Sequence, residues 1–405
     1  MTASQRGQVE PFHVMEVVKA VTDRQRTHGD AIALCVGQPG TPAPAPVLAA
    51  AAAALGDQQL GYTEAAGVWA FRERIAEHYN QAYSLAEPMG LLDEEPTAAL
   101  GTVETTRPAV DPSEVVVTTG SSGGFLLTLL AAFDAGDLVA MTRPGYPAYR
   151  NDILSVGCRL LEIPVGEQTR YQPTVAMLEA LPEVPAGLVL ASPSNPTGTI
   201  IDPGELAAIA AWCVAHDCLL ISDEIYHGIS YGRGCASARQ FGNEAVVVGS
   251  LSKYHSMTGW RVGWLLLPPA LRRPVELLQG NLAICAPALS QVAGVAAFDL
   301  ESATELDGHV ARYATNRELL LRRLPELGIT SFAPPDGAFY AYCDVSHVTD
   351  DTQRWCEEVL DATGVALAPG RDFDPVDGHR MVRLSFCGQT AELEEALDRL
   401  VGHLT

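Results

Sequence analysis

Short runs of apolar residues, many of them β-branched, recur through the middle of the chain and end in glycine, proline or polar turns. Helical patterns such as residues 203–216 separate several of these runs. Strands that are apolar on both faces and alternate with helices indicate a largely parallel sheet covered by helices on both sides. We therefore predict an α/β fold whose ligands bind at the carboxyl ends of the strands. The expected strands are 115–119, 138–142, 159–163, 187–191, 218–222, 245–249 and 262–267.

The pattern changes after residue 267. A mostly helical stretch at 270–327 is followed by expected strands at 339–343 and 381–386 and by a closing helix at 390–404. Strands and helices in this order indicate a smaller α+β domain. We therefore expect an N-terminal arm with part of the small domain, a large domain, and the small C-terminal domain, at 1–60, 61–290 and 291–405.

Residues 84–113 interrupt the large domain. They are acidic, rich in proline, alanine and threonine, and contain no aromatic residue. Such a composition cannot bury much apolar surface, so we predict an acidic surface insertion.

Composition narrows the class of protein. The chain has 405 residues, of which 47% are hydrophobic and 19% charged, so a soluble globular protein of two domains is expected. The formal net charge of −23 argues against nucleic acid or an anionic membrane as partner. An anion site must therefore be built locally from a few arginines and backbone amides.

Location and metal content follow from what the chain lacks. The N-terminus carries no apolar targeting segment, and no uncharged apolar run reaches the length of about 18 residues needed to span a membrane. The nine cysteines are scattered without a CxxC pair, which favours reduced thiols over a metal site. We expect a cytoplasmic protein without a bound metal.

Lysine is almost absent, which draws attention to where it remains. Only Lys19 and Lys253 are lysines among 26 basic residues. Arginine stays protonated, whereas a lysine can lose its proton and attack a carbonyl. Ser250 lies three residues before Lys253 and Arg261 eight after it, and both suit a phosphate. An amine beside a phosphate site indicates pyridoxal phosphate, an aldehyde cofactor with a phosphate tail.

A glycine-rich turn at 118–124 follows the first expected strand and precedes a helix. Such a turn presents free amides, including those of Ser121 and Ser122, to an anion. The same residues match GxSxG, the nucleophile elbow of α/β-hydrolases, with Ser122 as nucleophile. No HGGG-type oxyanion loop lies upstream, and a hydrolase leaves the other motifs unexplained.

Two more motifs follow buried strands. Asn195 begins Asn-Pro-Thr-Gly, which alone could be an ordinary turn. Asp223 begins Asp-Glu-Ile-Tyr, and a carboxylate there can keep a pyridinium nitrogen protonated, while Tyr226 can reach the phenolic oxygen of the same ring. Arg383 stands within a strand pattern, where it forms either an edge-strand salt bridge or a fork for a substrate carboxylate.

These motifs, in this order, resemble the class I/II aminotransferases, pyridoxal-phosphate enzymes of fold type I in the aspartate aminotransferase superfamily. The likeness runs from about residue 36 to the C-terminus. The resemblance implies a large, mostly parallel central sheet sandwiched by helices, with a smaller α+β domain beside it. It also implies transamination (EC 2.6.1.-), in which an amino acid gives its α-amino group to a 2-oxo acid by a ping-pong sequence.

Site residues carry over from the family motif by motif. Lys253 would form the aldimine with the cofactor and move the proton between the substrate α-carbon and C4′. Asp223 would hold the pyridine nitrogen, and Asn195 and Tyr226 the ring O3′. The remaining expected positions are Tyr146 stacked on the ring, Ser121, Ser122, Ser250 and Arg261 at the phosphate, and Gly37, Asn195 and Arg383 at the substrate.

Tyr62 matches the family tyrosine that reaches the phosphate of the neighbouring subunit. The resemblance therefore implies a homodimer with a shared active site.

Substrate choice rests on a missing cation. Aspartate-preferring relatives often carry a lysine where Ser122 stands here, and Lys19 is the only other lysine. Burying an unpaired distal carboxylate is costly, so we predict a neutral amino donor of alanine, valine or leucine type, with pyruvate or 2-oxoglutarate as acceptor. Aspartate aminotransferase with 2-oxoglutarate remains open, because a partner arginine could restore the missing charge. C–S lyase and decarboxylase chemistry on the same fold also remain open, and a DNA-binding regulator is disfavoured by the short N-terminal segment.

Overall fold

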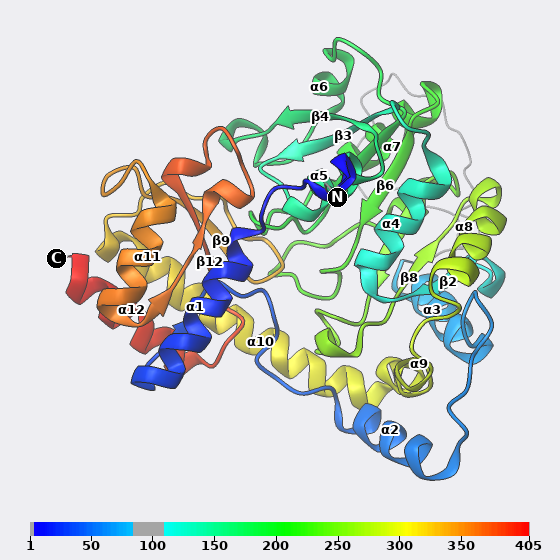
Figure 1. Cartoon of the computed structure of the whole chain (residues 1–405), viewed down its shortest axis with the longest axis horizontal. Coiled ribbons are helices and arrows are strands. Elements are labelled where there is room, and N and C mark those ends of the chain that lie inside the picture. Colours follow the sequence, from blue (N-terminus) through cyan, green and yellow to red (C-terminus); the bar gives the residue numbers. More distant parts are fainter. Residues whose placement is uncertain (1–3, 84–108, 405) are drawn as a thin grey trace.

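The computed structural model describes residues 4–83 and 109–404. Its main element is a seven-stranded sheet with the order β2-β8-β7-β6-β5-β3-β4 (Figure 1). All neighbouring strands are parallel except β8, which is antiparallel to both β2 and β7. The strands are β2 (Val115–Thr118), β3 (Leu138–Arg143), β4 (Arg159–Pro164), β5 (Gly187–Ala191), β6 (Leu219–Asp223), β7 (Val246–Ser250) and β8 (Gly263–Leu266). The predicted α/β class is confirmed, and each predicted strand lies within one residue of its observed ends.

Helices cover both faces of this sheet, as its apolar pattern requires. In β2, Val115 and Val117 pack on one face and Val116 on the other, because successive side chains of a strand alternate. The first face packs against α3 (Trp69–Ala82), α7 (Pro203–Ala215) and α9 (Ala288–Gly294). The second packs against α4 (Gly120–Ala132), α5 (Pro147–Ser155) and α8 (Pro269–Leu282).

The C-terminal part forms its own small sheet. Antiparallel strands lie in the order β11 (Ala368–Pro369), β12 (Met381–Ser385) and β9 (Tyr340–Asp344). The helices α10 (Leu300–Arg323), α11 (Thr352–Thr363) and α12 (Thr390–Leu404) pack on it, and the long α10 continues to α9 beside the large sheet (Figure 1).

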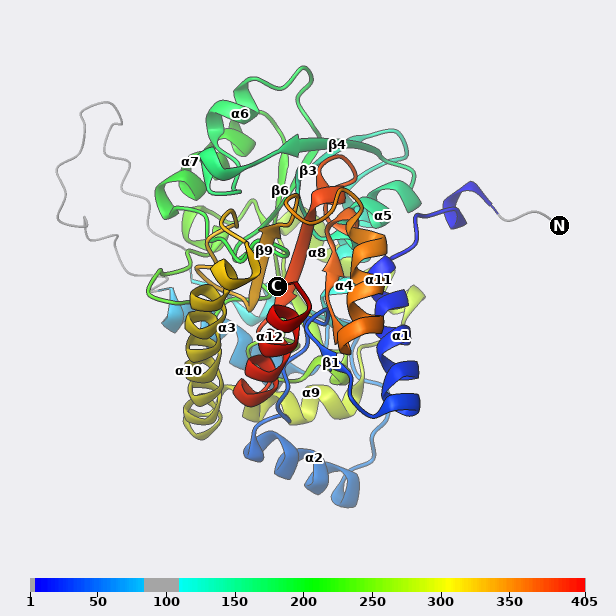
Figure 2. The same cartoon turned by 90° about the vertical axis from the view of Figure 1, so that its left-hand side faces the viewer.

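The beginning of the chain packs against this C-terminal part. Strand β1 (Ile32–Ala33) pairs in parallel with β10 (Val365–Ala366). Helix α1 (His13–His28) runs along the outside of the same part, and its Val14 and Val17 are buried there (Figure 2).

The remaining short elements connect these layers. They are α2 (Ala45–Asp57), α6 (Val175–Glu179) and the 3₁₀ turns Gln5–Gly7, Pro112–Glu114, Glu167–Thr169, Ala238–Phe241, Thr258–Trp260, Val295–Phe298, Leu324–Leu327, Gly370–Asp372 and Gly378–Arg380.

Most of the predicted insertion, residues 84–108, lies outside the described residues. Within the described ranges, none of the helices combines the length and the apolar character needed to cross a bilayer.

Candidate active site

A cavity of about 270 Å³ lies at the carboxyl ends of the central strands, where the large sheet, the C-terminal part and the start of α1 meet. This is where ligands bind in open α/β sheets. Most of the residues predicted from the sequence line it. They are Gly37, Ser121, Ser122, Tyr146, Asn195, Asp223, Tyr226, Lys253, Arg261 and Arg383.

Lys253 lies in the turn after β7 and reaches the cavity. Its Nζ donates a hydrogen bond to the carbonyl oxygen of Gly37 over 2.6 Å and lies 5.8 Å from the centroid of the Tyr226 ring. Burial lowers the pKa of Lys253 to about 8, an effect that Arg383 and Arg261 reinforce. Roughly a tenth of this amine is therefore unprotonated at pH 7, far more than for an ordinary lysine, and can act as a nucleophile or base.

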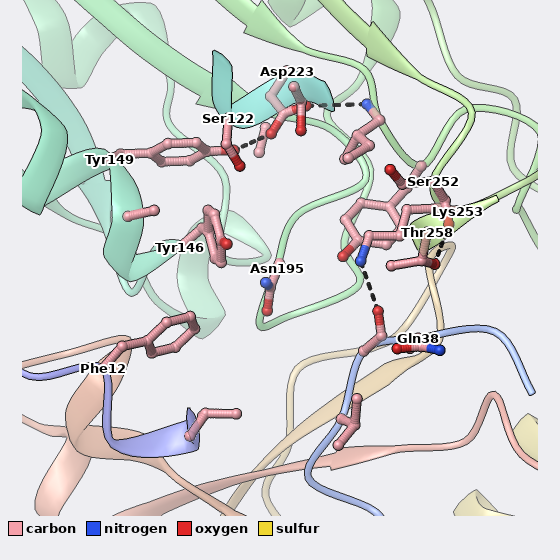
Figure 3. A pocket seen from close by; sticks show the side chains of 18 of the residues that line it. Phe12, Gln38, Ser122, Tyr146, Tyr149, Asn195, Asp223, Ser252, Lys253 and Thr258 are labelled. Atoms are coloured by element: carbon pink, nitrogen blue, oxygen red, sulfur yellow. Dashed lines mark hydrogen bonds between the residues drawn. The ribbon is translucent and has the colours of Figure 1, made fainter. Parts of the chain in front are cut away.

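Asp223 is the last residue of β6 and faces the same cavity. Its side chain accepts hydrogen bonds from the backbone N–H of Ile225, over 3.1 Å, and from the hydroxyl of Tyr149 (Figure 3). Burial raises the pKa of Asp223 to about 6, against the opposing effect of these hydrogen bonds and of Lys253. Above that pH the site holds a buried carboxylate, which suits a cationic nitrogen.

Tyr149 was not predicted from the sequence. It lies in the first turn of α5, three residues after Tyr146, which directly precedes the helix, and both line the cavity. The i, i+3 spacing of two tyrosines was the available signal, because such residues share a helix face.

Arg383 lies in the centre of the small sheet, in β12, and is 3% exposed. Its guanidinium donates to Asn195 Oδ1 over 2.8 Å and to the carbonyl oxygen of Cys35 over 2.6 Å. The rings of Tyr340 and Phe373 lie against it, with centroids 4.4 and 4.6 Å from its Cζ. Among the described residues it has no acidic partner, so the edge-strand salt bridge considered for it is wrong.

Arg383 retains a nitrogen without a hydrogen-bond partner among the described residues. Its Nε is buried and has no hydrogen-bond partner within the described ranges. An unpaired buried donor is costly, and here a ligand carboxylate could satisfy it.

Tyr340 is a second residue that sequence reasoning missed. Its hydroxyl lies 2.8 Å from the hydroxyl of Tyr226. A Cβ added to Gly37 would lie 1.7 Å from the same Tyr340 oxygen, so glycine allows the segment between β1 and α2 to approach the cavity. No local motif marks Tyr340, because its role depends on two distant segments meeting.

The part of the cavity beside the start of α4 is suited to an anion. Ser121 and Ser122 occupy the first turn of α4, where backbone N–H groups point out of the helix. Arg261 lies against this turn, and a Cβ at Gly120, whose φ is 67°, would come within 2.5 Å of its Nη2. The glycine therefore permits an arginine and a helix N-terminus to face one ligand together.

Ser250 and Tyr62 are the two predicted residues that do not line the cavity. Ser250 lies just behind it, with its Oγ 2.8 Å from the Oγ of Ser252, which does line it. Tyr62 is 83% exposed in the single chain.

The start of α1 closes one side of the cavity with apolar side chains. Phe12 and Met15 line it, and the Phe12 ring lies 6.0 Å from that of Tyr146 (Figure 3). The backbone N–H groups of His13 and Val14 donate to the carboxylate of Asp372 over 3.0 and 2.7 Å, which fixes this end of the helix.

The hydrolase interpretation of Ser122 fails on geometry. None of the described residues lining the cavity is a histidine, and no hydrogen bond joins the Ser122 hydroxyl to a base in the described part of the chain. Without an adjacent base a serine is not activated as a nucleophile.

Comparison with known proteins gives a consistent result. The sequence model of the family described as aminotransferase class I and II matches residues 29–400. A valine–pyruvate aminotransferase of Mycobacterium tuberculosis is 51% identical over 98% of this chain and 96% of the relative. The crystal structure of an aminotransferase from Mycobacterium tuberculosis has a TM-score of 0.92 at 50% identity and covers 100% of this chain and 99% of that one. An aspartate aminotransferase from Thermus thermophilus with maleate has a TM-score of 0.89 at 28% identity over 99% of both chains.

Proposed function

Since the chain belongs to the class I and II aminotransferases, it is an enzyme that moves an amino group from an amino acid to a 2-oxo acid, and we propose that neither substrate has a charged side chain. The donor would be an amino acid of alanine, valine or leucine type and the acceptor pyruvate. The name of the Mycobacterium tuberculosis relative, valine–pyruvate aminotransferase, supports this choice.

One observation carries the substrate class. The cavity is lined by three cations, Lys253, Arg261 and Arg383, within the described part of the chain. If Lys253 performs the chemistry, Arg261 binds a phosphate and Arg383 binds the α-carboxylate, none is left for a second carboxylate. Burying an unpaired carboxylate costs on the order of several kcal/mol, whereas Phe12 and Met15 offer an apolar wall.

The same residues fit pyridoxal phosphate. Gly120 leaves room for Arg261 beside the first turn of α4, and Lys253 supplies an amine with a pKa of about 8. When bound, this cofactor supplies an aldehyde that condenses with amines and a ring that accepts electrons from the substrate α-carbon. The residues that would hold it are Lys253, Asp223, Asn195, Tyr226, Tyr146, Ser121, Ser122, Ser250 and Arg261.

Each of these residues has a task that its environment supports. Asp223, ionised above a pH of about 6, would hold a proton on the ring nitrogen. Asn195 uses its Oδ1 for Arg383, which leaves its amide N–H₂ for the phenolic oxygen. The flat ring of Tyr146 would set the orientation of the cofactor, and the α4 amides would fix its phosphate.

Arg383 would orient the substrate. Its planar guanidinium is held between two aromatic rings, so it is ordered before the substrate arrives. With the α-carboxylate fixed there, the α-hydrogen is presented to Lys253. The Lys253 Nζ would take this proton from the α-carbon and deliver it to C4′ of the cofactor.

We also propose a homodimer in which each site includes Tyr62 of the partner subunit. In the single chain Tyr62 is 83% exposed, and Arg261 is exposed beside the cavity, so both are available to meet across an interface. We infer a cytoplasmic location from the nine cysteines, all of which are free thiols and most of which are buried.

Steady-state kinetics with purified enzyme test the substrate class. We expect kcat/KM for valine, alanine or leucine with pyruvate to exceed that for aspartate with 2-oxoglutarate by about 100-fold, which is about 2.7 kcal/mol of transition-state binding. Amino acid formed and 2-oxo acid formed should appear in equal amounts, which separates transfer from lyase or decarboxylase chemistry. A preference of the same size for aspartate would contradict the proposal.

A further inference from the structure

One charged side chain of the cavity has no task in the chemistry described above. Asp152 lies on α5, one turn after Tyr149, and lines the cavity. No hydrogen bond or ion pair involves its carboxylate in the described part of the chain. Its neighbour Arg150 turns away and binds Glu162 over 2.8 Å.

The wall of the cavity that carries Asp152 adjoins the apolar side chains at the start of α1, because the Phe12 ring lies 6.0 Å from the ring of Tyr146, the residue directly before α5. The neighbouring Asn151 contacts the carbonyl oxygen of Glu10, next to the segment that carries Phe12. Burial is the main cause of the raised pKa values of Tyr146 and Tyr149, and the charges of Asp223 and, to a smaller extent, Asp152 add to it.

The cations of the site do not compensate this charge. Burial is the cause of the raised pKa of Asp152, about 6, and no cation opposes it. In the described part of the chain, no ion pair joins Asp152 to Arg261 or Arg383. At neutral pH the carboxylate is largely ionised and partly buried, which is where a charge acts most strongly on a ligand.

We propose that Asp152 is a specificity-determining residue that disfavours substrates with a second carboxylate, both as amino donor and as oxo-acid acceptor. Two like charges in a partly buried site repel, and the missing cation at Ser122 leaves nothing to offset this repulsion. Aspartate, glutamate and 2-oxoglutarate are affected, whereas valine, alanine and pyruvate are not. The inference rests on the proposed function, because it explains how one cavity rejects acidic members of both substrate pairs.

The substitution Asp152→Asn tests this, since it removes the charge and keeps the shape. We expect the ratio of kcat/KM for aspartate to that for valine to rise by about tenfold or more, mainly through a lower KM for aspartate. Binding of succinate, a dicarboxylate that cannot react, should tighten by a similar factor, while binding of butyrate stays unchanged. The matched control is Glu179→Gln, at the exposed end of α6, which changes net charge equally and should leave both ratios unchanged.

The outcomes separate the inference from the function on which it rests. A wild-type enzyme that prefers aspartate overturns the neutral-substrate proposal. A wild-type enzyme that prefers valine, combined with an unchanged aspartate-to-valine ratio in Asp152→Asn, overturns the role of Asp152 alone. Because the ratio is taken within each variant, a general loss of activity does not mimic the effect. Asp152→Ser provides a second neutral variant and should shift the ratio in the same direction.

Discussion

At the scale of single residues, the site depends on groups whose protonation is set by their surroundings. Lys253 and Asp223 line one cavity, yet burial moves the pKa of the first down to about 8 and that of the second up to about 6. Between these values the amine keeps a reactive fraction while the carboxylate is charged. This combination suits an enzyme that must attack an aldehyde and hold a ring proton at the same pH.

The first prediction concerns the amine. Because only the neutral amine attacks an aldehyde, the rate at which cofactor-free enzyme captures pyridoxal phosphate covalently should rise with pH and level off above about 8. An ordinary lysine would continue to gain reactivity up to a pH of about 10.4. This rate is measured by mixing the cofactor-free enzyme with pyridoxal phosphate at each pH and following the absorption of the bound cofactor. Lys253→Arg is the control and should show no covalent capture, and a rate that still rises tenfold between pH 9 and 10 would contradict the assignment.

Sequence reasoning found the residues whose chemistry is unusual and missed those whose role is geometric. Lys253, Asp223 and Asn195 stand in motifs after strands, and parallel strands bring their ends to one edge. Tyr149 and Tyr340 are common aromatic residues, and their hydroxyls matter only because folding places them on Asp223 and Tyr226.

At the scale of elements, a buried polar network fixes the strand ends that carry the site. Glu224 follows Asp223 directly, and its Oε1 accepts from the hydroxyls of Ser222 and Ser237 and from the N–H of Ala238. His227 Nε2 lies 2.9 Å from the carbonyl oxygen of Ser192, which joins the turn after β6 to the turn after β5. Asp223 ends β6 directly before one of these turns and Asn195 lies in the other, so this network sets their relative position.

The second prediction concerns the stability of this network. Burial raises the pKa of Glu224 to about 8, above its value of about 4.3 in an unfolded chain. Above about pH 4.3 the folded state therefore keeps a proton that the unfolded chain loses. The contribution of Glu224 to the free energy of unfolding is full below about pH 4.3 and is lost as the pH rises through about 8. Glu224→Gln stays neutral at every pH, so its free energy of unfolding should increase relative to that of wild type between pH 5 and pH 8.5, which means that the variant becomes relatively more stable.

Chemical denaturation of both proteins at the two pH values measures this difference. Glu179→Gln serves as the exposed control and should run parallel to wild type. A difference between Glu224→Gln and wild type that does not change with pH would show that Glu224 is ionised throughout.

At the scale of the whole molecule, the cavity lies between the large sheet and the C-terminal part, and some contacts between distant segments could not be predicted from the sequence. The strands of the large sheet were predictable because each is a compact apolar run. The pairing of β1 with β10 was not, since each strand has two residues and their partners are more than 300 positions apart. The antiparallel β8 was also outside the reach of the pattern, which does not encode strand direction.

The third prediction tests the proposed shared site by complementation. Lys253→Ala and Tyr62→Ala should each be nearly inactive as homodimers. In a mixed dimer, the site on the Tyr62→Ala chain keeps its own lysine and receives Tyr62 of the partner subunit. Random mixing in equal amounts should therefore restore about a quarter of wild-type activity, because half of the dimers are mixed and each has one intact site.

Activity after unfolding and refolding the two variants together is the measurement, with each variant refolded alone as control. Absence of recovery, although sedimentation shows mixed dimers, would contradict a tyrosine that serves the neighbouring site.

The position of Arg383 has a consequence for the order in which the enzyme becomes competent during synthesis. All strands of the large sheet, together with Asp223, Lys253 and Arg261, have left the ribosome well before β12 is made. Domains generally fold as units as the chain emerges, at about 5–20 residues per second. The cofactor end of the site can therefore form while translation continues, whereas the end that receives the α-carboxylate waits for the last strand. A nascent chain can thus acquire its cofactor pocket before it can select an amino acid.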